Sequence, residues 1–308
     1  MATLYGQNFR VLWHDPMVDE NQQQYEVIAG AKSCVITYNS NTEDSRTKDS
    51  VGISSRPHIT TQSWQVQVDT LNVSNMGVLL TAIKNGEKFE LLWDEVSTTD
   101  NQTMEEANFA RKGSAYLSDF TVNFNDRETS FQSIQFTGSG AVSALSTEQS
   151  ININPFTYGT QGQFVRLFVA QGTVANAKPI AFAKTLSFHV SVALEQSTTK
   201  DTEGYFEVQE PVGLSYDISS NALIRSGETI TSQALANSLA DIVTMYNARN
   251  LVYFQIANVS GANNRTKGSV IVSGAAVITN LTMNGPEPGQ KATYDFSMQG
   301  VGDYTVGS

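Results

Sequence analysis

One stretch of the chain recurs at a fixed distance, and this recurrence limits the possible folds more than any single motif does. Thr47-Lys48-Asp49 returns as Thr199-Lys200-Asp201, and Ser63-Trp64-Gln65-Val66 is matched by Ser215-Tyr216-Asp217-Ile218. The two separations, 199 − 47 and 215 − 63, both equal 152. A repeat unit of this length corresponds to a whole domain, because the units of solenoids and propellers are only about 20–50 residues long.

The match continues beyond this stretch if the second copy contains an insertion around Glu228 to Asn237. Gly113 to Asn123 then aligns with Gly274 to Asn284, with apolar residues over apolar ones and polar over polar. Both copies also end alike, since a Phe-x-Gly-x-Gly pattern over 136–140 is answered by Met-x-Gly-x-Gly over 298–302. We therefore predict two tandem copies of one domain.

The predicted boundaries place the first domain at residues 1–142 and the second at 164–308. Residues 143–163 are rich in Ser, Thr, Asn, Gly and Gln, which is typical of a linker. With 308 residues, 40% of them hydrophobic, the chain is long enough to bury a core in each domain. The single cysteine, Cys34, excludes an intramolecular disulfide and is expected to be a small buried residue on a strand.

Apolar and polar residues alternate along much of the chain. Trp64 to Asp69 and Phe120 to Asn125 place apolar side chains on one face and polar side chains on the other, which predicts half-buried antiparallel strands. Further strand candidates are rich in β-branched and aromatic residues. They are 34–38, 131–136, 186–192, 251–256, 270–272 and 294–298.

Helical spacing of apolar residues occurs once in each copy. Ser74 to Asn85 carries it before Gly86, and Thr231 to Asn247 carries the corresponding pattern in the second copy. The predicted fold class is therefore mainly β, with one α-helix beside the strands of each domain.

Residues that could carry catalysis or bind a metal are sparse. The three histidines, His14, His58 and His189, lie far apart, and no His-Glu-x-x-His or Cys-x-x-Cys pattern accompanies them. No carboxylate lies in an apolar stretch that would raise its pKa for acid or base work. We therefore predict no catalytic residues, no metal, no cofactor and no enzyme activity.

The charge balance argues against binding to nucleic acid. The chain has 30 acidic and 19 basic residues, a formal net charge of −11, and its Lys and Arg residues form no stripe. Such a surface is expected to repel the phosphates of DNA. The first residues show no secretory signal, and no apolar run reaches the roughly 18 residues of a membrane span. We expect a protein that is made in the cytoplasm and has no membrane partner.

A long polar segment precedes the first repeated strand of each copy. Tyr38 to Asp49 lies between two β-rich runs, and Glu195 to Gln209 is its counterpart. Both are expected to be extended loops of a hairpin. The simplest interpretation is a solvated connector, but structureless loops of more than about 12 residues are uncommon in compact domains unless they have a function.

Taken together, the order of these elements resembles the major tail protein, or tail tube protein, of long-tailed, siphovirus-like bacteriophages. The resemblance rests on a polar Thr-Lys-Asp loop, the strand 63–69, a helix, a strand ending near Trp93, the Gly-x-Ala-x-Leu-x-Asp-Phe strand 113–120 and the closing strand 136–140. It covers about 27–142 and again about 185–305. The motifs are diffuse, so the specificity comes from their order and their recurrence.

The resemblance implies a β-sandwich or partial barrel with one flanking helix, and a ring of six domains whose inner sheets join around a channel. Most members of that family carry one tube domain per chain. A chain with two copies would complete the ring as a homotrimer with pseudo-sixfold symmetry. The implied location is the virion tail, where rings stack into a tube through which DNA passes during genome ejection without specific binding. The implied partners are further copies of the chain and other tail proteins, such as terminator, tape measure and distal tail proteins.

The same resemblance suggests roles for particular residues. Candidates for ring stacking lie in the two polar segments: Asn41, Asp44, Arg46, Lys48, Asp49, Thr199, Lys200 and Asp201. Candidates for acidic residues that face the lumen lie on the polar faces of the predicted strands: Asp69, Asp119 and Asp295. For these three, ordinary solvent exposure is the alternative interpretation.

Other functional classes are compatible with a mainly β chain. The main alternative is a β-sandwich binding module of a cell surface, such as an adhesin or a carbohydrate binder. The absence of a visible signal peptide and of a clustered Trp/Tyr platform counts against it. A secretion-system tube protein usually has a single domain, and an enzyme would need a composite site between the copies.

Overall fold

A computed structural model describes most of the chain. The described residues are 9–14, 25–28, 30–46, 55–71, 75–95, 103–104, 111–144, 149–152, 161–199, 202, 204–224, 236–260, 266–285 and 287–307. Within them the fold is mainly β, with two α-helices, as predicted.

Six strands make up the main sheet of the first half. They are β1 (Phe9–His14), β3 (Ala31–Asp44), β4 (Pro57–Thr70), β5 (Lys88–Glu95), β7 (Arg111–Asn125) and β8 (Phe131–Gly138). They pair antiparallel in the order β1-β5-β7-β8-β4-β3. Three short strands lie beside this set: β2 (Tyr25–Val27), β6 (Thr103–Met104) and β9 (Ser143–Ala144).

The second half has the same number of main strands in the same order along the chain. They are β11 (Val165–Gln171), β13 (Ala183–Gln196), β14 (Gln209–Leu223), β15 (Val252–Ser260), β16 (Thr266–Asn284) and β17 (Thr293–Val306), with a short β12 (Lys178–Pro179) beside β11. They pair antiparallel in the order β11-β15-β16-β17-β14-β13. Each pairing of the main strands in the first half therefore has a counterpart in the second.

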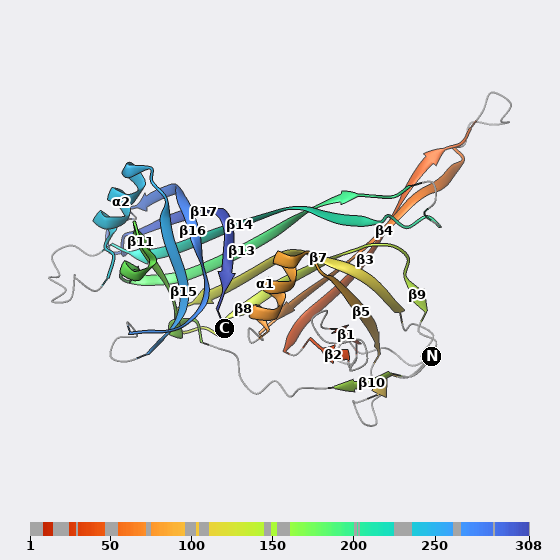
Figure 1. Ribbon diagram of the computed structural model, residues 1–308, viewed down its shortest axis with the longest axis horizontal. Helices are drawn as coiled ribbons and strands as arrows, with labels where there is room; N and C mark the ends of the chain where they lie inside the picture. Colours follow the sequence, from red (N-terminus) through yellow and green to blue (C-terminus); the bar gives the residue numbers. More distant parts are fainter. Residues whose placement is uncertain are drawn as a thin grey trace.

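One ladder joins the two halves. β7 pairs with β5 near its start and with β13 of the second half near its end, from Asp119 opposite Ser191 to Asn125 opposite Thr185. As a result the described strands form one continuous hydrogen-bonded network. Figure 1 shows β13 and β14 running alongside β7 and β8 across the length of the molecule.

Each half contributes one large aromatic side chain to the core from an equivalent strand. Trp64 of β4 is 1% exposed, and Tyr216 of β14 is 2% exposed. Trp64 fits because glycine leaves room for its ring: a Cβ atom on Gly138 would lie 2.1 Å from the indole. Likewise, a Cβ atom on Gly300 would lie 2.2 Å from the ring of Tyr216. The glycines of the two closing patterns thus serve the same packing role.

The helices follow β4 and β14. α1 (Met76–Asn85) ends at Gly86, which adopts a left-handed backbone with φ 65°. α2 (Leu239–Ala248) begins much later than the prediction from Thr231, because Ser238 and Asp241 form a capping box that starts the helix. Residues 236–238 precede the helix, and 231–235 lie outside the described residues.

Two predicted irregular segments contain strands. The predicted linker 143–163 includes β9 and β10 (Gln149–Asn152), and these pair with β7, β2 and β6 of the first half. The loop predicted to begin at Tyr38 begins later, because β3 continues to Asp44. Both segments are polar, so their strands show no alternation of apolar and polar residues that would predict them. Backbone hydrogen bonds to a neighbouring strand hold them in the extended conformation.

Candidate functional site

A broad polar face extends over eight neighbouring strands. Their order is β3-β4-β8-β7-β13-β14-β17-β16, with four strands from each half. The polar face consists of the side chains that alternate with buried ones. They lie in the segments 33–39, 63–69, 119–125, 131–137, 185–191, 215–221, 280–284 and 293–299.

The side chains of the polar face are nearly all hydroxyls, amides and carboxylates. On β4, for example, Gln65 and Gln67 alternate with buried Trp64, Val66 and Val68. The alternation follows from the pleat of a strand, which sends successive side chains to opposite faces. One face of the sheet therefore packs against the hydrophobic core, and the other face is polar.

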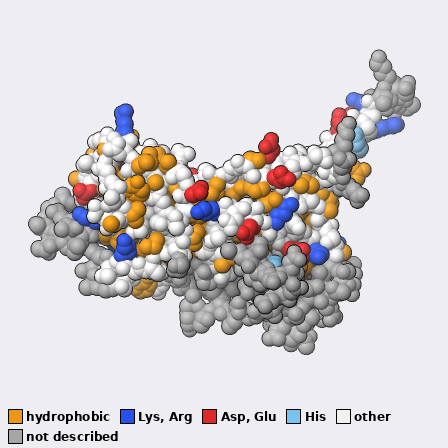
Figure 2. Space-filling view, in the orientation of Figure 1, with side chains coloured by type: hydrophobic (Ala, Val, Ile, Leu, Met, Phe, Trp, Pro, Cys, Tyr) orange, Lys and Arg blue, Asp and Glu red, His pale blue; other side chains and the backbone are white. Residues whose placement is uncertain are grey.

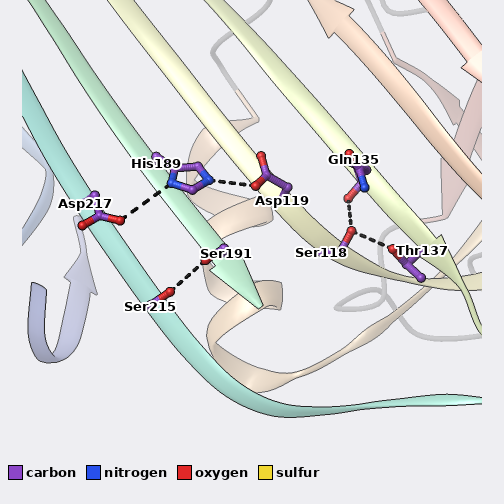
Figure 3. A network of polar contacts seen from close by, with 8 residues as sticks. All are labelled: Ser118, Asp119, Gln135, Thr137, His189, Ser191, Ser215 and Asp217. Carbon is purple, nitrogen blue, oxygen red and sulfur yellow. Dashed lines mark hydrogen bonds and ion pairs between the residues drawn. The ribbon is translucent and has the colours of Figure 1, made fainter. Parts of the chain in front are cut away.

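Two of the carboxylates on this face meet a histidine. His189 Nε2 lies 2.7 Å from Asp119 Oδ2 across the β7–β13 ladder, and His189 Nδ1 lies 3.9 Å from Asp217 Oδ2 on β14. Figure 3 shows His189 between the two aspartates. Because β7 belongs to the first half and β13 to the second, this contact ties the halves together.

Hydroxyl groups continue the network on either side of the histidine. The Ser191 and Ser215 Oγ atoms lie 2.8 Å apart on β13 and β14. On the other side, Thr137 donates to Ser118 Oγ over 2.8 Å, and Ser118 donates to the Gln135 carbonyl oxygen over 3.1 Å (Figure 3). These hydroxyl groups bond to other neutral groups. The aspartate carboxylates therefore carry the formal negative charge of this region.

The remaining predicted acidic residues also lie on the polar face. Asp69 Oδ2 accepts a hydrogen bond of 2.7 Å from Ser33 Oγ on β3. Asp295 accepts from the side-chain amides of Asn221 and Asn284, each over 2.6 Å. Sequence reasoning missed Asp217, although its place between Tyr216 and Ile218 on an alternating strand was a usable signal.

The segments that form the polar face contain no lysine and no arginine. Four aspartates and His189 are their only ionisable side chains apart from Cys34, Tyr38, Tyr216 and Tyr294, which lie on the opposite side of the strands. A phosphate near this face would find hydroxyl and amide groups but no fixed cation to release counterions. These segments therefore offer polar groups but no lysine or arginine to an anionic ligand.

The described stacking candidates of the first half, Asn41, Asp44 and Arg46, lie toward the end of a long hairpin. Asn41 and Asp44 are on β3, and all described residues from Asn41 to Arg46 are exposed. Asp44 Oδ1 accepts from the backbone N–H groups of Arg46 and Arg56, each over 3.0 Å, and this closes the described end of the hairpin. Figure 1 shows the β3–β4 hairpin projecting away from the body of the molecule. Lys48 and Asp49 lie outside the described residues.

The corresponding hairpin of the second half stays against its own chain. Gln62 donates its backbone N–H to the Tyr205 carbonyl oxygen over 2.6 Å and accepts from Glu207 N over 2.9 Å. Gly140 donates to the Glu207 carbonyl oxygen over 2.8 Å. Thr199 is exposed, while Lys200 and Asp201 lie outside the described residues.

Among the described residues, no group of three or more His, Cys, Asp or Glu side chains is arranged to hold a metal ion. Within the same part of the chain, no helix is both long and apolar enough to cross a membrane.

No protein-family model and no curated protein matches this chain. Several solved structures are similar to about half of it. The tail of an empty gene transfer agent particle with C6 symmetry matches with a TM-score of 0.38 and 15% identity, over 49% of this chain and 100% of that chain.

Two further structures match to a similar extent. The tail tube of SPP1 matches with a TM-score of 0.35 and 15% identity, over 48% of this chain and 79% of that chain. The baseplate of the anti-feeding prophage matches with a TM-score of 0.34 and 11% identity, over 49% of this chain and 98% of that chain. The chain is thus similar, over about half its length, to components of phage tails and related particles.

Proposed function

We propose that this protein is a non-enzymatic structural subunit of a phage tail tube, located in the tail of the virion. The observation that carries the proposal is the polar face, to which each half of the chain contributes four strands and no Lys or Arg residue. A continuous sheet with such a face suits the wall of a channel for DNA. Further copies of the chain and other tail proteins, such as terminator, tape measure and distal tail proteins, are the proposed partners.

We propose that the chain consists of two tandem copies of a tube domain, with boundaries at 1–142 and 164–308. The matching order of strand pairing supports this. Trp64 and Tyr216, 152 residues apart, occupy β4 and β14, which have equivalent neighbours in the two halves. The register agrees as well, since Val66 lies opposite Phe136 and Ile218 lies opposite Met298.

The proposed assembly is a ring of three chains, in which six domains are related by pseudo-sixfold symmetry. A ring closes the sheet and so removes the exposed strand edges that lead to uncontrolled aggregation. In this arrangement the polar face surrounds the channel, and the carboxylates of Asp69, Asp119, Asp217 and Asp295 repel the DNA that passes through it.

Cryo-electron microscopy of the purified protein tests this proposal. We expect rings or tubes with three chains per ring, and we expect Asp119 and Asp217 to border the central channel. Native mass spectrometry checks the stoichiometry independently. Six chains per ring, or a particle in which the polar face points outward, contradicts the proposal.

We further propose that the projecting β3–β4 hairpin connects successive rings. Asn41 and Thr61 lie directly opposite each other, so residues 42–60 can be replaced by an Asn-Gly turn without changing the register. The described residues removed are all exposed, and the core should therefore lose little stability. We expect single rings to form and tube growth to stop, as measured by electron microscopy and sedimentation.

The same specimens supply the control for this truncation. Circular dichroism and thermal melting should match those of the full-length chain, because the segment 33–39 and all of the core remain. Tubes of normal length would show that the hairpin is only a connector, whereas loss of the single rings would point to a defect within the ring.

A further inference from the structure

The β7–β13 ladder, where the two halves of the chain meet, shows how two such halves can pack against each other. In the β7–β13 ladder, Val122 lies opposite Phe188 and Phe120 lies opposite Val190. All four side chains are 0% exposed. This ladder lets each half complete the core of the other along a shared pair of strands.

The two strands at the outer edges of the polar face, β3 and β16, are the counterparts of the two strands in this ladder. β3 corresponds to β13, because Tyr38 lies opposite Trp64 just as Val190 lies opposite Tyr216. At the other edge, β16 corresponds to β7. Both strands shift register at the same point, between Leu117 and Asp119 in β7 and between Ile278 and Asn280 in β16.

Within the described part of the chain, neither edge has the neighbour that its counterpart has. Among the described residues, β3 pairs only with β4, and the segment 280–284 of β16 pairs only with β17. The corresponding strands β13 and β7 pair with each other. An antiparallel edge with open N–H and C=O groups can accept a strand from another chain.

Exposure of apolar side chains marks the same two edges. Tyr38 is 52% exposed, whereas its counterpart Val190 is 0% exposed. Met283 is 55% exposed, whereas its counterpart Val122 is 0% exposed. An apolar side chain in such a position gains stability when a neighbouring strand removes it from water.

The helices show the same difference between the inner junction and the outer edge. In α1, Met76, Leu79, Leu80, Ala82 and Ile83 are buried. Tyr304 of β17 covers this helix, since its hydroxyl donates to the Leu80 carbonyl oxygen over 2.7 Å and its own carbonyl oxygen accepts from Lys84 Nζ over 3.1 Å.

Within the described part of the chain, α2 is less covered than α1. Only Ile242 is buried in α2, and Tyr246, the counterpart of Ile83, is 41% exposed. Figure 2 shows hydrophobic side chains exposed on the second half of the molecule around the position of α2. The first half of another copy, seated as the second half sits on the first, would cover this helix.

We propose that β3 of one copy pairs antiparallel with the segment 280–284 of β16 in the next copy, in the register of the β7–β13 ladder. Carried over from that ladder, Val35 lies opposite Asn284, Ile36 opposite Met283, and Tyr38 opposite Leu281. The proposal rests on the proposed assembly into rings and goes further by naming the edges and the register. Two different edges meet, so the contact is heterologous and repeats from copy to copy until the ring closes.

Engineered disulfides test the register. The variant carries Val35→Cys and Asn284→Cys, two exposed positions on the polar side of the proposed ladder. Cα atoms of directly opposed residues lie within the range of a disulfide, whereas residues displaced by two positions do not. All variants also carry Cys34→Ser, which removes the native thiol, although burial raises the pKa of that thiol to about 12.

Two matched variants serve as controls. Val35→Cys with Thr282→Cys shifts one partner by two residues on the same face. Ser187→Cys with Asn123→Cys places the pair at the corresponding position of the β7–β13 ladder, where these residues lie opposite each other within one chain. The second pair should close without linking chains and shows that the oxidation conditions are adequate.

After oxidation of assembled protein, we expect the Val35→Cys and Asn284→Cys variant to run as covalent dimers and trimers on a non-reducing gel. The shifted variant should remain monomeric. Rings without cross-links in the in-register variant, or equal cross-linking in the shifted one, would overturn the proposed register while leaving the tube subunit proposal intact. Failure of wild-type protein to form rings at all would contradict both proposals.

Discussion

Replacement of Gly138 by alanine is expected to lower the free energy of unfolding of the first half by about 3 kcal/mol or more. Overpacking of a core typically costs about 1–3 kcal/mol, and this clash is severe. The added Cβ atom would lie 2.1–2.3 Å from three atoms of the Trp64 indole, far inside van der Waals contact. The ring cannot shift easily to the other side, because a Cβ atom on Gly113 would already lie 2.5 Å from it. The Trp64 Nε1–H also donates to the Gly140 carbonyl oxygen over 3.0 Å, which holds the ring in place.

The corresponding change in the second half is Gly300→Ala, with a Cβ atom 2.2 Å from the Tyr216 ring, and it should have a comparable effect. Gly77→Ala in α1 is the matched control. Its Cβ atom would meet Val306 at an ordinary 3.7 Å, and alanine favours a helix over glycine by about 1 kcal/mol. Denaturation by urea measures all three. A Gly138→Ala midpoint equal to that of wild type would contradict the packing account.

Alternation predicted the cores of the strands because one face of each is buried. In Trp64 to Asp69, for instance, every second residue is apolar, and Trp64, Val66 and Val68 are indeed buried. The same signal fails where both faces of a strand meet solvent. The outer part of β3, up to Asp44, is exposed on both faces and therefore lacks an apolar period, although it pairs with β4 throughout.

Helix boundaries depend on local hydrogen bonds more than on apolar spacing. The start of α2 was visible in the sequence as Ser238 followed three residues later by Asp241, a pattern of a capping box. The apolar residue Leu235 upstream suggested a longer helix. Asn237, directly before the cap, instead donates to the Val169 and Lys178 carbonyl oxygens, which fixes the chain outside the helix.

Three of the four aspartates of the polar face, Asp69, Asp119 and Asp295, were predicted to lie on polar strand faces, but their neighbours could not be predicted. Alternation places Asp119 on the face opposite to Phe120, yet it says nothing about which strand lies beside β7. The contact between Asp119 and His189 requires the β7–β13 ladder, and these residues are 70 positions apart. Pairing between distant strands depends on the packing of the whole core, which a local pattern does not contain.

The β7–β13 ladder also underlies a prediction for the edge of β16. We expect Met283→Glu to abolish ring formation while the chain stays folded. Met283 is 55% exposed in the isolated chain, and exposed substitutions usually change stability by less than about 0.5 kcal/mol. At the proposed contact between copies, the carboxylate would be enclosed opposite Ile36 without a cation beside it. A buried charge without a partner destabilises its surroundings by about 3–5 kcal/mol. Each of the three contacts between chains in a ring would be weakened in this way.

Met283→Leu is the matched control, because leucine keeps an apolar side chain of similar size at the edge of β16 and should preserve assembly. Thermal melting of both variants establishes that the chain is folded, and analytical ultracentrifugation together with electron microscopy measures assembly. Val122, the counterpart of Met283 within the chain, is already 0% exposed beside Phe188, so the proposed contact predicts that Met283 becomes inaccessible in the same way. Rings formed by Met283→Glu at the wild-type concentration would show that this edge of β16 does not join neighbouring copies.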